Sequence, residues 1–118
     1  MAEDPKYKND LEERTAIFAK RVRNFVRSVP KDIVTIEDGR QVVRSSGSVG
    51  ANYIEANESL SKKDFAMRIK ISRKEAKETR YWLGMYENLP SDLQKERDKL
   101  IQESTEFIKI FSSIISRL

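Results

Sequence analysis

The hydrophobic positions of this chain recur at alternating steps of three and four residues, which is the spacing of one face of an α-helix. The first run places its core-facing positions at Leu11, Thr15, Phe18, Val22, Phe25 and Val29. Its start is either Asp10, which forms a capping box with Glu13, or Asp4-Pro5, because proline suits the first helical position. Pro30 interrupts the pattern, which therefore predicts a first helix that ends just before this residue.

A second helix is predicted after a connection over residues 30–34. It begins either at Thr35, paired with Asp38, or at Asp38, paired with Gln41. The periodic pattern then continues to about Asn57.

The third and fourth helices each have a start signal and a core face. Ser61 with Asp64 predicts the cap of the third helix, and Ser91 with Gln94, directly after Pro90, opens the fourth. The core face of the third helix is expected to be Phe65, Ile69, Ser72, Ala76, Thr79, Leu83 and Tyr86. That of the fourth is expected to be Leu93, Leu100, Phe107, Phe111, Ile114 and Leu118.

No segment of any length alternates apolar and polar residues with the period of two that a strand requires. Four helices with short connections predict an all-α, antiparallel up-and-down four-helix bundle. A length of 118 residues suits one domain. We therefore expect a single bundle over residues 9–118, preceded by a flexible N-terminal tail at residues 1–8.

The second helix carries an unusual row of polar residues beside two packing faces. This row, the polar ladder, consists of Gln41, Arg44, Ser48, Asn52 and Glu55. Gly47 and Gly50 lie on a neighbouring stripe, and each costs about 1 kcal/mol relative to Ala inside a helix. Such a cost is usually offset by close packing or by a function. We interpret the ladder as a structural network that fixes helix register within the bundle or between subunits.

The amino-acid composition limits the kinds of catalytic and binding site that this chain can form. The chain has no cysteine and no histidine, which excludes disulfides, zinc–thiolate sites and histidine-based catalysis. No Walker-type phosphate loop is present. No apolar run approaches the length of a membrane span, and the N-terminus lacks the apolar core of a signal peptide. These features predict a cytoplasmic protein without a membrane partner, a cofactor or catalytic residues.

A broad basic face is predicted on the third helix. It is formed by Lys62, Lys63, Lys70, Arg73, Lys74, Lys77 and Arg80. The formal net charge is +4, and cations along a helix face can track the phosphates of a polyanion. The basic face is thus a candidate for binding RNA or DNA, while a solvated outer face of a bundle is the alternative.

Carboxylates offer a weaker candidate site. Glu55, Glu75 and Glu78 could converge between the second and third helices, where they could perform acid–base chemistry or bind a hard cation. Arg44 lies nearby and is more simply explained as the salt-bridge partner of these carboxylates. We predict no metal site, and a carboxylate- or metal-dependent enzyme stays a distant alternative.

The third helix has more apolar surface than one bundle seam needs. A flank of Met67, Ile71, Trp82 and Met85 lies away from its core face. The fourth helix has a similarly wide apolar arc: Ile101, Ile108, Ile110 and Ile115. Deep burial within one chain and a subunit interface both account for these residues, since large apolar patches seldom stay exposed.

The sequence resembles the family of 23S rRNA intervening-sequence proteins in the stretches 44–49 and 51–56 and, downstream, in Ser61, Asp64-Phe65, 74–79 and Tyr81-Trp82-Leu83. The resemblance implies a left-handed up-and-down four-helix bundle that assembles as a homopentamer. Some family members are encoded in insertions within bacterial 23S rRNA genes. A related protein, the accessory protein of diversity-generating retroelements, is a pentameric bundle that binds nucleic acid and a reverse transcriptase.

Together these features predict a non-enzymatic, oligomeric protein that binds RNA or another nucleic acid through basic helix faces. The alternative is a protein-interaction scaffold for a nucleic-acid enzyme. The expected partners are further copies of the chain, RNA or DNA, and a nucleic-acid-processing protein. Glu75 and Glu78 are expected to share the structural role of the polar ladder.

Overall fold

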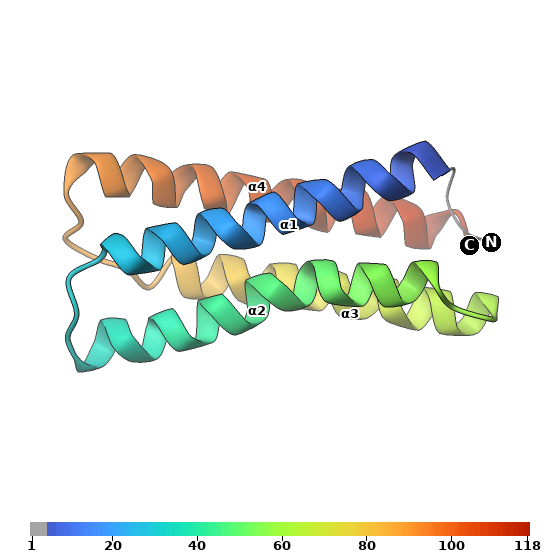
Figure 1. The fold of residues 1–118 in the computed structure, drawn as a ribbon, viewed down its shortest axis with the longest axis horizontal. Helices are drawn as coiled ribbons and strands as arrows, with labels where there is room; N and C mark the ends of the chain where they lie inside the picture. Colours follow the sequence, from blue (N-terminus) through green and yellow to red (C-terminus); the bar gives the residue numbers. More distant parts are fainter. Residues whose placement is uncertain (1–4) are drawn as a thin grey trace.

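The computed structural model describes residues 5–118, with side chains described from Asp10 onward. Over this range the chain forms four α-helices and no strand: α1 (Pro5–Ser28), α2 (Ile33–Asn57), α3 (Lys62–Leu83) and α4 (Ser91–Ser116). The helices run antiparallel in an up-and-down bundle measuring 44 × 23 × 20 Å (Figure 1). The predicted all-α bundle is confirmed.

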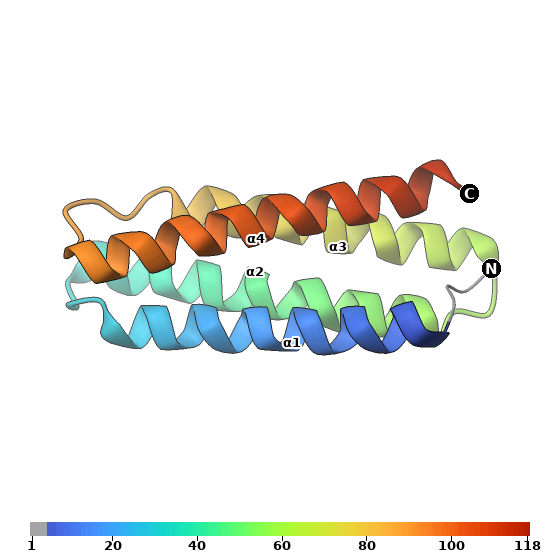
Figure 2. The same ribbon diagram turned by 90° about the horizontal axis from the view of Figure 1, so that it is seen from above.

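The helices form two layers, with α1 beside α2 in one and α3 beside α4 in the other (Figure 2). Each helix packs on its two neighbours, whereas the backbones of α1 and α3 lie diagonally across the bundle and do not approach each other. The α1–α2 and α3–α4 connections lie at one end of the bundle (Figure 1). The α2–α3 connection, the start of α1 and the end of α4 lie at the other.

The core forms where the apolar faces of all four helices meet. Its largest fully buried side chains include Phe18, Phe25, Tyr53, Phe65, Ile69, Leu83, Leu100, Phe107 and Phe111. The rings of Phe18 and Phe107 meet edge to face with centroids 5.3 Å apart, which links α1 to α4. Leu93 is only half-buried and Leu118 is exposed, because both lie near the ends of the bundle. The other predicted core positions are buried.

Helix α2 begins earlier than the sequence pattern indicated. The side chain of Asp32 accepts a hydrogen bond from the backbone N–H of Thr35 at 2.8 Å. In return, the Asp32 backbone N–H donates to Thr35 Oγ1 at 2.9 Å. This reciprocal capping box starts the helix at Ile33, so the predicted starts at Thr35 and Asp38 were wrong.

The other helix starts gave mixed outcomes. Ser61 caps α3 as predicted and accepts from the backbone N–H of Asp64 at 3.0 Å. At α4, Pro90 occupies the cap position, and no side-chain capping bond forms with Ser91. Helix α1 begins at Pro5, so residues 5–8 of the predicted tail are helical. Residues 1–4 lie outside the described residues.

Gly50 allows α1 and α2 to approach closely. A β-carbon on Gly50 would lie 2.7 Å from Thr15 Oγ1, closer than real β-carbons come to other atoms, and 3.0 Å from Thr15 Cβ, which is a very tight contact. A β-carbon on Gly47 would meet only the guanidinium of Arg23, at 3.3 Å. Close packing therefore accounts for Gly50, whereas the neighbour of Gly47 is the flexible end of a side chain.

Candidate nucleic-acid interface

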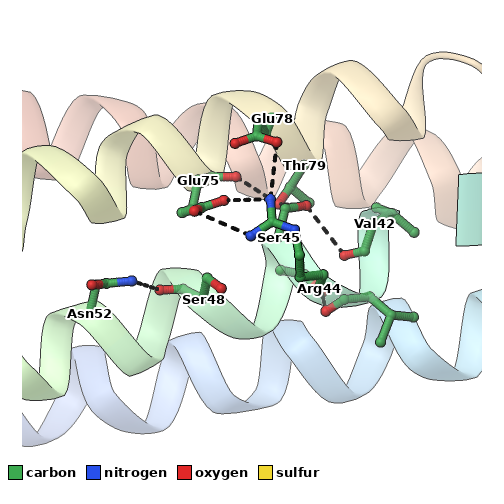
Figure 3. Close-up of polar contacts among 10 residues, drawn as sticks. Val42, Arg44, Ser45, Ser48, Asn52, Glu75, Glu78 and Thr79 are labelled. Carbon is green, nitrogen blue, oxygen red and sulfur yellow. Dashed lines mark hydrogen bonds and ion pairs between the residues drawn. The ribbon is translucent and has the colours of Figure 1, made fainter. Parts of the chain in front are cut away.

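Arg44 joins α2 to α3 through two carboxylates (Figure 3). Its Nη2 donates to Glu75 Oε1 at 3.1 Å and to Glu78 Oε1 at 3.0 Å. Glu75 is buried and Arg44 is about half-exposed. The hydrogen bond that Arg44 donates to Glu75, with the charges of both carboxylates, raises the pKa of Arg44 above its ordinary value. The predicted salt-bridge role of Arg44 is confirmed.

Asn52 makes the second cross-link of the polar ladder. Its Nδ2 donates to the backbone carbonyl of Ser48 at 2.9 Å, as drawn in Figure 3, and its Oδ1 accepts from Arg68 Nη1 of α3 at 3.0 Å. Gln41 instead donates to Glu37 on its own helix, at 3.1 Å. The ladder is therefore bonded to α3 through Arg44 and Asn52.

Glu55 does not join the other two carboxylates. Its side chain is exposed, and Glu75 and Glu78 are both held by Arg44. Within the described residues, no group of three or more potential ligand side chains could hold a metal ion. The predicted convergence of three glutamates was therefore wrong, because Arg44 neutralises two of them and the third turns to solvent.

Two buried hydroxyl contacts also hold α2 and α3 together. The hydroxyls of Ser45 and Thr79 share a hydrogen bond at 2.9 Å (Figure 3). The Ser72 hydroxyl donates to the backbone carbonyl of Val49 at 2.9 Å. Sequence reasoning assigned Ser72 and Thr79 to the core face but did not identify these partners. The recurrence of small hydroxyl residues at core positions was the available signal.

The basic face of α3 divides into exposed lysines and half-buried arginines. Lys62 and Lys63 lie on the first turn, and Lys70, Lys74 and Lys77 follow along the outer surface; all five are exposed. We call the last three the lysine row.

The arginines of the face lean towards α4. Arg73 Nη1 lies 3.4 Å from Ser112 Oγ, and Arg80 Nη1 lies 3.4 Å from Thr105 Oγ1. The seven predicted cations thus occur on one side of α3, with the lysines free to reach outward and the arginines at its border with α4.

The acidic residues of α3 lie outside this arc. Between residues 62 and 85 they are Asp64, Glu75 and Glu78. At 100° per residue, all three lie on the side of α3 that turns away from Arg73 and Arg80. Glu75 and Glu78 are occupied by Arg44 of α2. The polar seam with α2 therefore holds Glu75 and Glu78 away from the cations, and α3 carries no acidic residue within an arc of about 120°.

The cations of α1 do not extend this face. Arg21 pairs with Glu96 of α4 at 3.0 Å, Arg23 donates to the carbonyl of Ala19, and Arg27 donates to Asn24. Helix α1 lies diagonally across the bundle from α3, so its cations belong to the opposite side of the molecule.

Apolar side chains lie beside the lysines. Met67 and Ile71 line a shallow groove of about 490 Å³ whose charged border consists of Lys63, Asp64, Lys70 and Lys74. Met67 is 48% and Met85 41% exposed, while Ile71 is half-buried. Deep burial therefore does not account for the whole apolar flank of α3.

The bundle and its residue pattern can be compared with known proteins. The model of the 23S rRNA-intervening sequence protein family matches residues 8–113, which is nearly the whole chain. The chain belongs to this family. The predicted family resemblance is confirmed, and with it the all-α bundle.

A solved structure supports the assignment of this chain to the family. It is a protein of unknown function from the S23 ribosomal protein family of Bacteroides thetaiotaomicron, 29% identical in sequence, with a TM-score of 0.77. The match covers 92% of this chain and 97% of the other. No curated protein sequence matches the chain. None of the helices in the described part is both long and apolar enough to cross a bilayer.

Proposed function

We propose that this family member is a non-enzymatic, oligomeric, cytoplasmic protein that binds RNA or another nucleic acid through the basic face of α3. The single observation that carries the proposal is an arc of α3 that has seven cations, five of them exposed lysines, and no acidic residue. Cations in such an arrangement bind phosphates without reading sequence. The family names are consistent with an RNA partner, since they refer to 23S rRNA and to a ribosomal protein.

Oligomerisation is part of the proposal. One basic face offers about three or four simultaneous phosphate contacts, which gives weak, non-specific binding. Several copies of the face in one assembly raise the avidity without new chemistry. The exposed apolar residues Met67 and Met85 beside the basic face supply surface that a neighbouring subunit could bury.

A protein-interaction scaffold for a nucleic-acid-processing enzyme is the second candidate. The same exposed Met67 and Met85 favour it, because solvent-exposed methionines adapt readily to partner surfaces. The two candidates differ in the role of the lysine row, which only the first requires.

The test compares two variants with the same change in net charge. One is Lys70→Glu, Lys74→Glu, Lys77→Glu. The other is Lys20→Glu, Lys95→Glu, Lys99→Glu, which reverses exposed lysines of α1 and α4. Binding of single-stranded RNA, duplex RNA and DNA is titrated at low and at physiological salt, and light scattering checks that the assembly state is unchanged.

We expect the lysine-row variant to lose at least tenfold in affinity at low salt, and the matched control to lose much less. Equal loss in both variants would mean that only overall charge matters. Absence of binding by the unmodified protein at low salt would contradict the proposal and favour the scaffold.

A further inference from the structure

An exposed aromatic ring continues the lysine row. Tyr81 is 58% exposed, and it is on the same stripe of α3 as Lys70, Lys74 and Lys77. At 100° per residue it lies within about 40° of all three. The rise from Lys77 to Tyr81 is about 6 Å, one turn of the helix. A large aromatic side chain thus sits at the C-terminal end of a row of ammonium groups.

The ring of Tyr81 is supported by its neighbour. Tyr81 and Trp82 meet edge to face, with centroids 5.1 Å apart and an angle of 81° between the rings. Trp82 itself is half-buried and packs against the hydrophobic core. The core therefore holds Trp82, and Trp82 restricts Tyr81, although more than half of the tyrosine side chain stays open to solvent.

We propose that Tyr81 is a stacking platform for an unpaired base of a single-stranded nucleic acid whose phosphates follow Lys70, Lys74 and Lys77. The inference rests on the proposed function, because it takes the lysine row to bind phosphates. Positively charged tracks interleaved with aromatic rings are how proteins hold single strands, since every base has a π-face that can stack.

The arrangement favours a single strand over a duplex. In a duplex each base is stacked between its neighbours, so no base face is available to a side chain on the protein surface. A single strand can bind its phosphates to the lysine row and place the next base on Tyr81. The absence of acidic residues among these positions favours a polyanion over a neutral partner.

Two probes with equal phosphate number separate stacking from charge. One is a single-stranded oligouridine of about 12 nucleotides, a length within the usual site size of single-strand binders. The other is an abasic strand of the same length. Trp82 is the only tryptophan, so its fluorescence reports directly on a base placed against Tyr81.

We expect the unmodified protein to bind oligouridine about 5- to 150-fold more tightly than the abasic strand, with a change in Trp82 fluorescence. Tyr81→Leu should remove this difference while abasic binding stays unchanged, and Tyr81→Phe should retain it. Ile54→Ala, at an exposed residue of α2, is the matched surface control and should change neither.

Equal binding of the two strands by the unmodified protein would overturn the stacking role and leave phosphate binding intact. Binding of neither strand at low salt would overturn the proposed function as well. Vesicles of anionic phospholipid form a third arm. Binding to vesicles without binding to oligouridine would assign the face to a lipid surface and contradict the inference.

Discussion

Individual side chains of the α2–α3 seam show which polar residues are structural. Arg44 holds Glu75 and Glu78, and Asn52 holds Arg68, so these residues fix the pairing of two helices. Glu55 belongs to the same stripe of α2 but is exposed. Position on a helix stripe therefore predicted the ladder, whereas the length and direction of the facing side chains decided which members are bonded across the seam.

Replacing Asn52 tests this distinction. Asn52→Ala should lower the free energy of unfolding by about 1 kcal/mol, because Arg68 and the ladder lose a partly buried hydrogen bond. Glu55→Ala should stay within about 0.5 kcal/mol of the unmodified protein, as is usual for surface substitutions. Urea unfolding measures both. Equal costs for the two variants would show that the cross-helix bond contributes nothing.

Asp38 makes stability depend on pH. It is 7% exposed, and burial, followed by the charges of Glu37 and Asp32, raises its pKa above the ordinary value. A raised carboxyl pKa means that the folded state prefers the protonated form. The contribution of Asp38 to the free energy of unfolding is therefore fully present below the pKa that this carboxyl has in the unfolded chain. It is lost as the pH rises through the pKa that the carboxyl has in the folded state.

Asp38→Asn should accordingly raise the melting temperature at pH 7, and the gain should vanish near pH 3, where Asp38 is protonated in both states. Thermal unfolding across this pH range measures the effect. Glu87→Gln, which removes the carboxylate of an exposed loop residue, is the control for the loss of one negative charge. A constant or opposite effect of Asp38→Asn would contradict the role of burial.

At the scale of the elements, periodicity and proline positions predicted all four helices and most of their core faces. Pro30 and the Ser61 cap marked boundaries, because each acts through its own backbone or the next three residues. The start of α2 was missed, since Asp32 and Thr35 form a capping box that lacks the usual glutamate or glutamine. The hydrogen-bond partner of each residue in the α2–α3 seam depends on how the two helices pair. The periodicity of one helix does not show which residues of the other helix lie opposite it, so these partners could not be predicted.

Gly47 and Gly50 of α2 provide a test at this scale. Gly50→Ala should destabilise the bundle despite the better helix propensity of alanine, because the new methyl group would collide with Thr15. Gly47→Ala should be neutral or stabilising by up to about 1 kcal/mol, since Arg23 can move aside. Thr15→Ala should recover part of the loss in the Gly50→Ala background. Stabilisation by Gly50→Ala alone would disprove the close approach.

At the scale of the whole molecule, the resemblance to the family predicts five chains of 13.7 kDa each. Light scattering at micromolar concentration should give about five times the chain mass. Met67→Glu together with Met85→Glu should lower this mass if the apolar flank of α3 lies between subunits, because charged groups are costly to bury. A monomer across the concentration range would rule out assembly. An unchanged mass in the variant would show that the interface between subunits does not include Met67 and Met85.

The central claim is that phosphates bind to the lysine row, and the salt dependence of binding tests it most directly. Anisotropy of a labelled single-stranded RNA gives the association constant at several salt concentrations. Three or four contacts predict a log–log slope of about −2 to −3, or steeper where several faces engage one strand. Lys74→Gln with Lys77→Gln should flatten the slope by about 1 to 1.5. An unchanged slope in this variant, or no binding of the unmodified protein at low salt, would contradict the account.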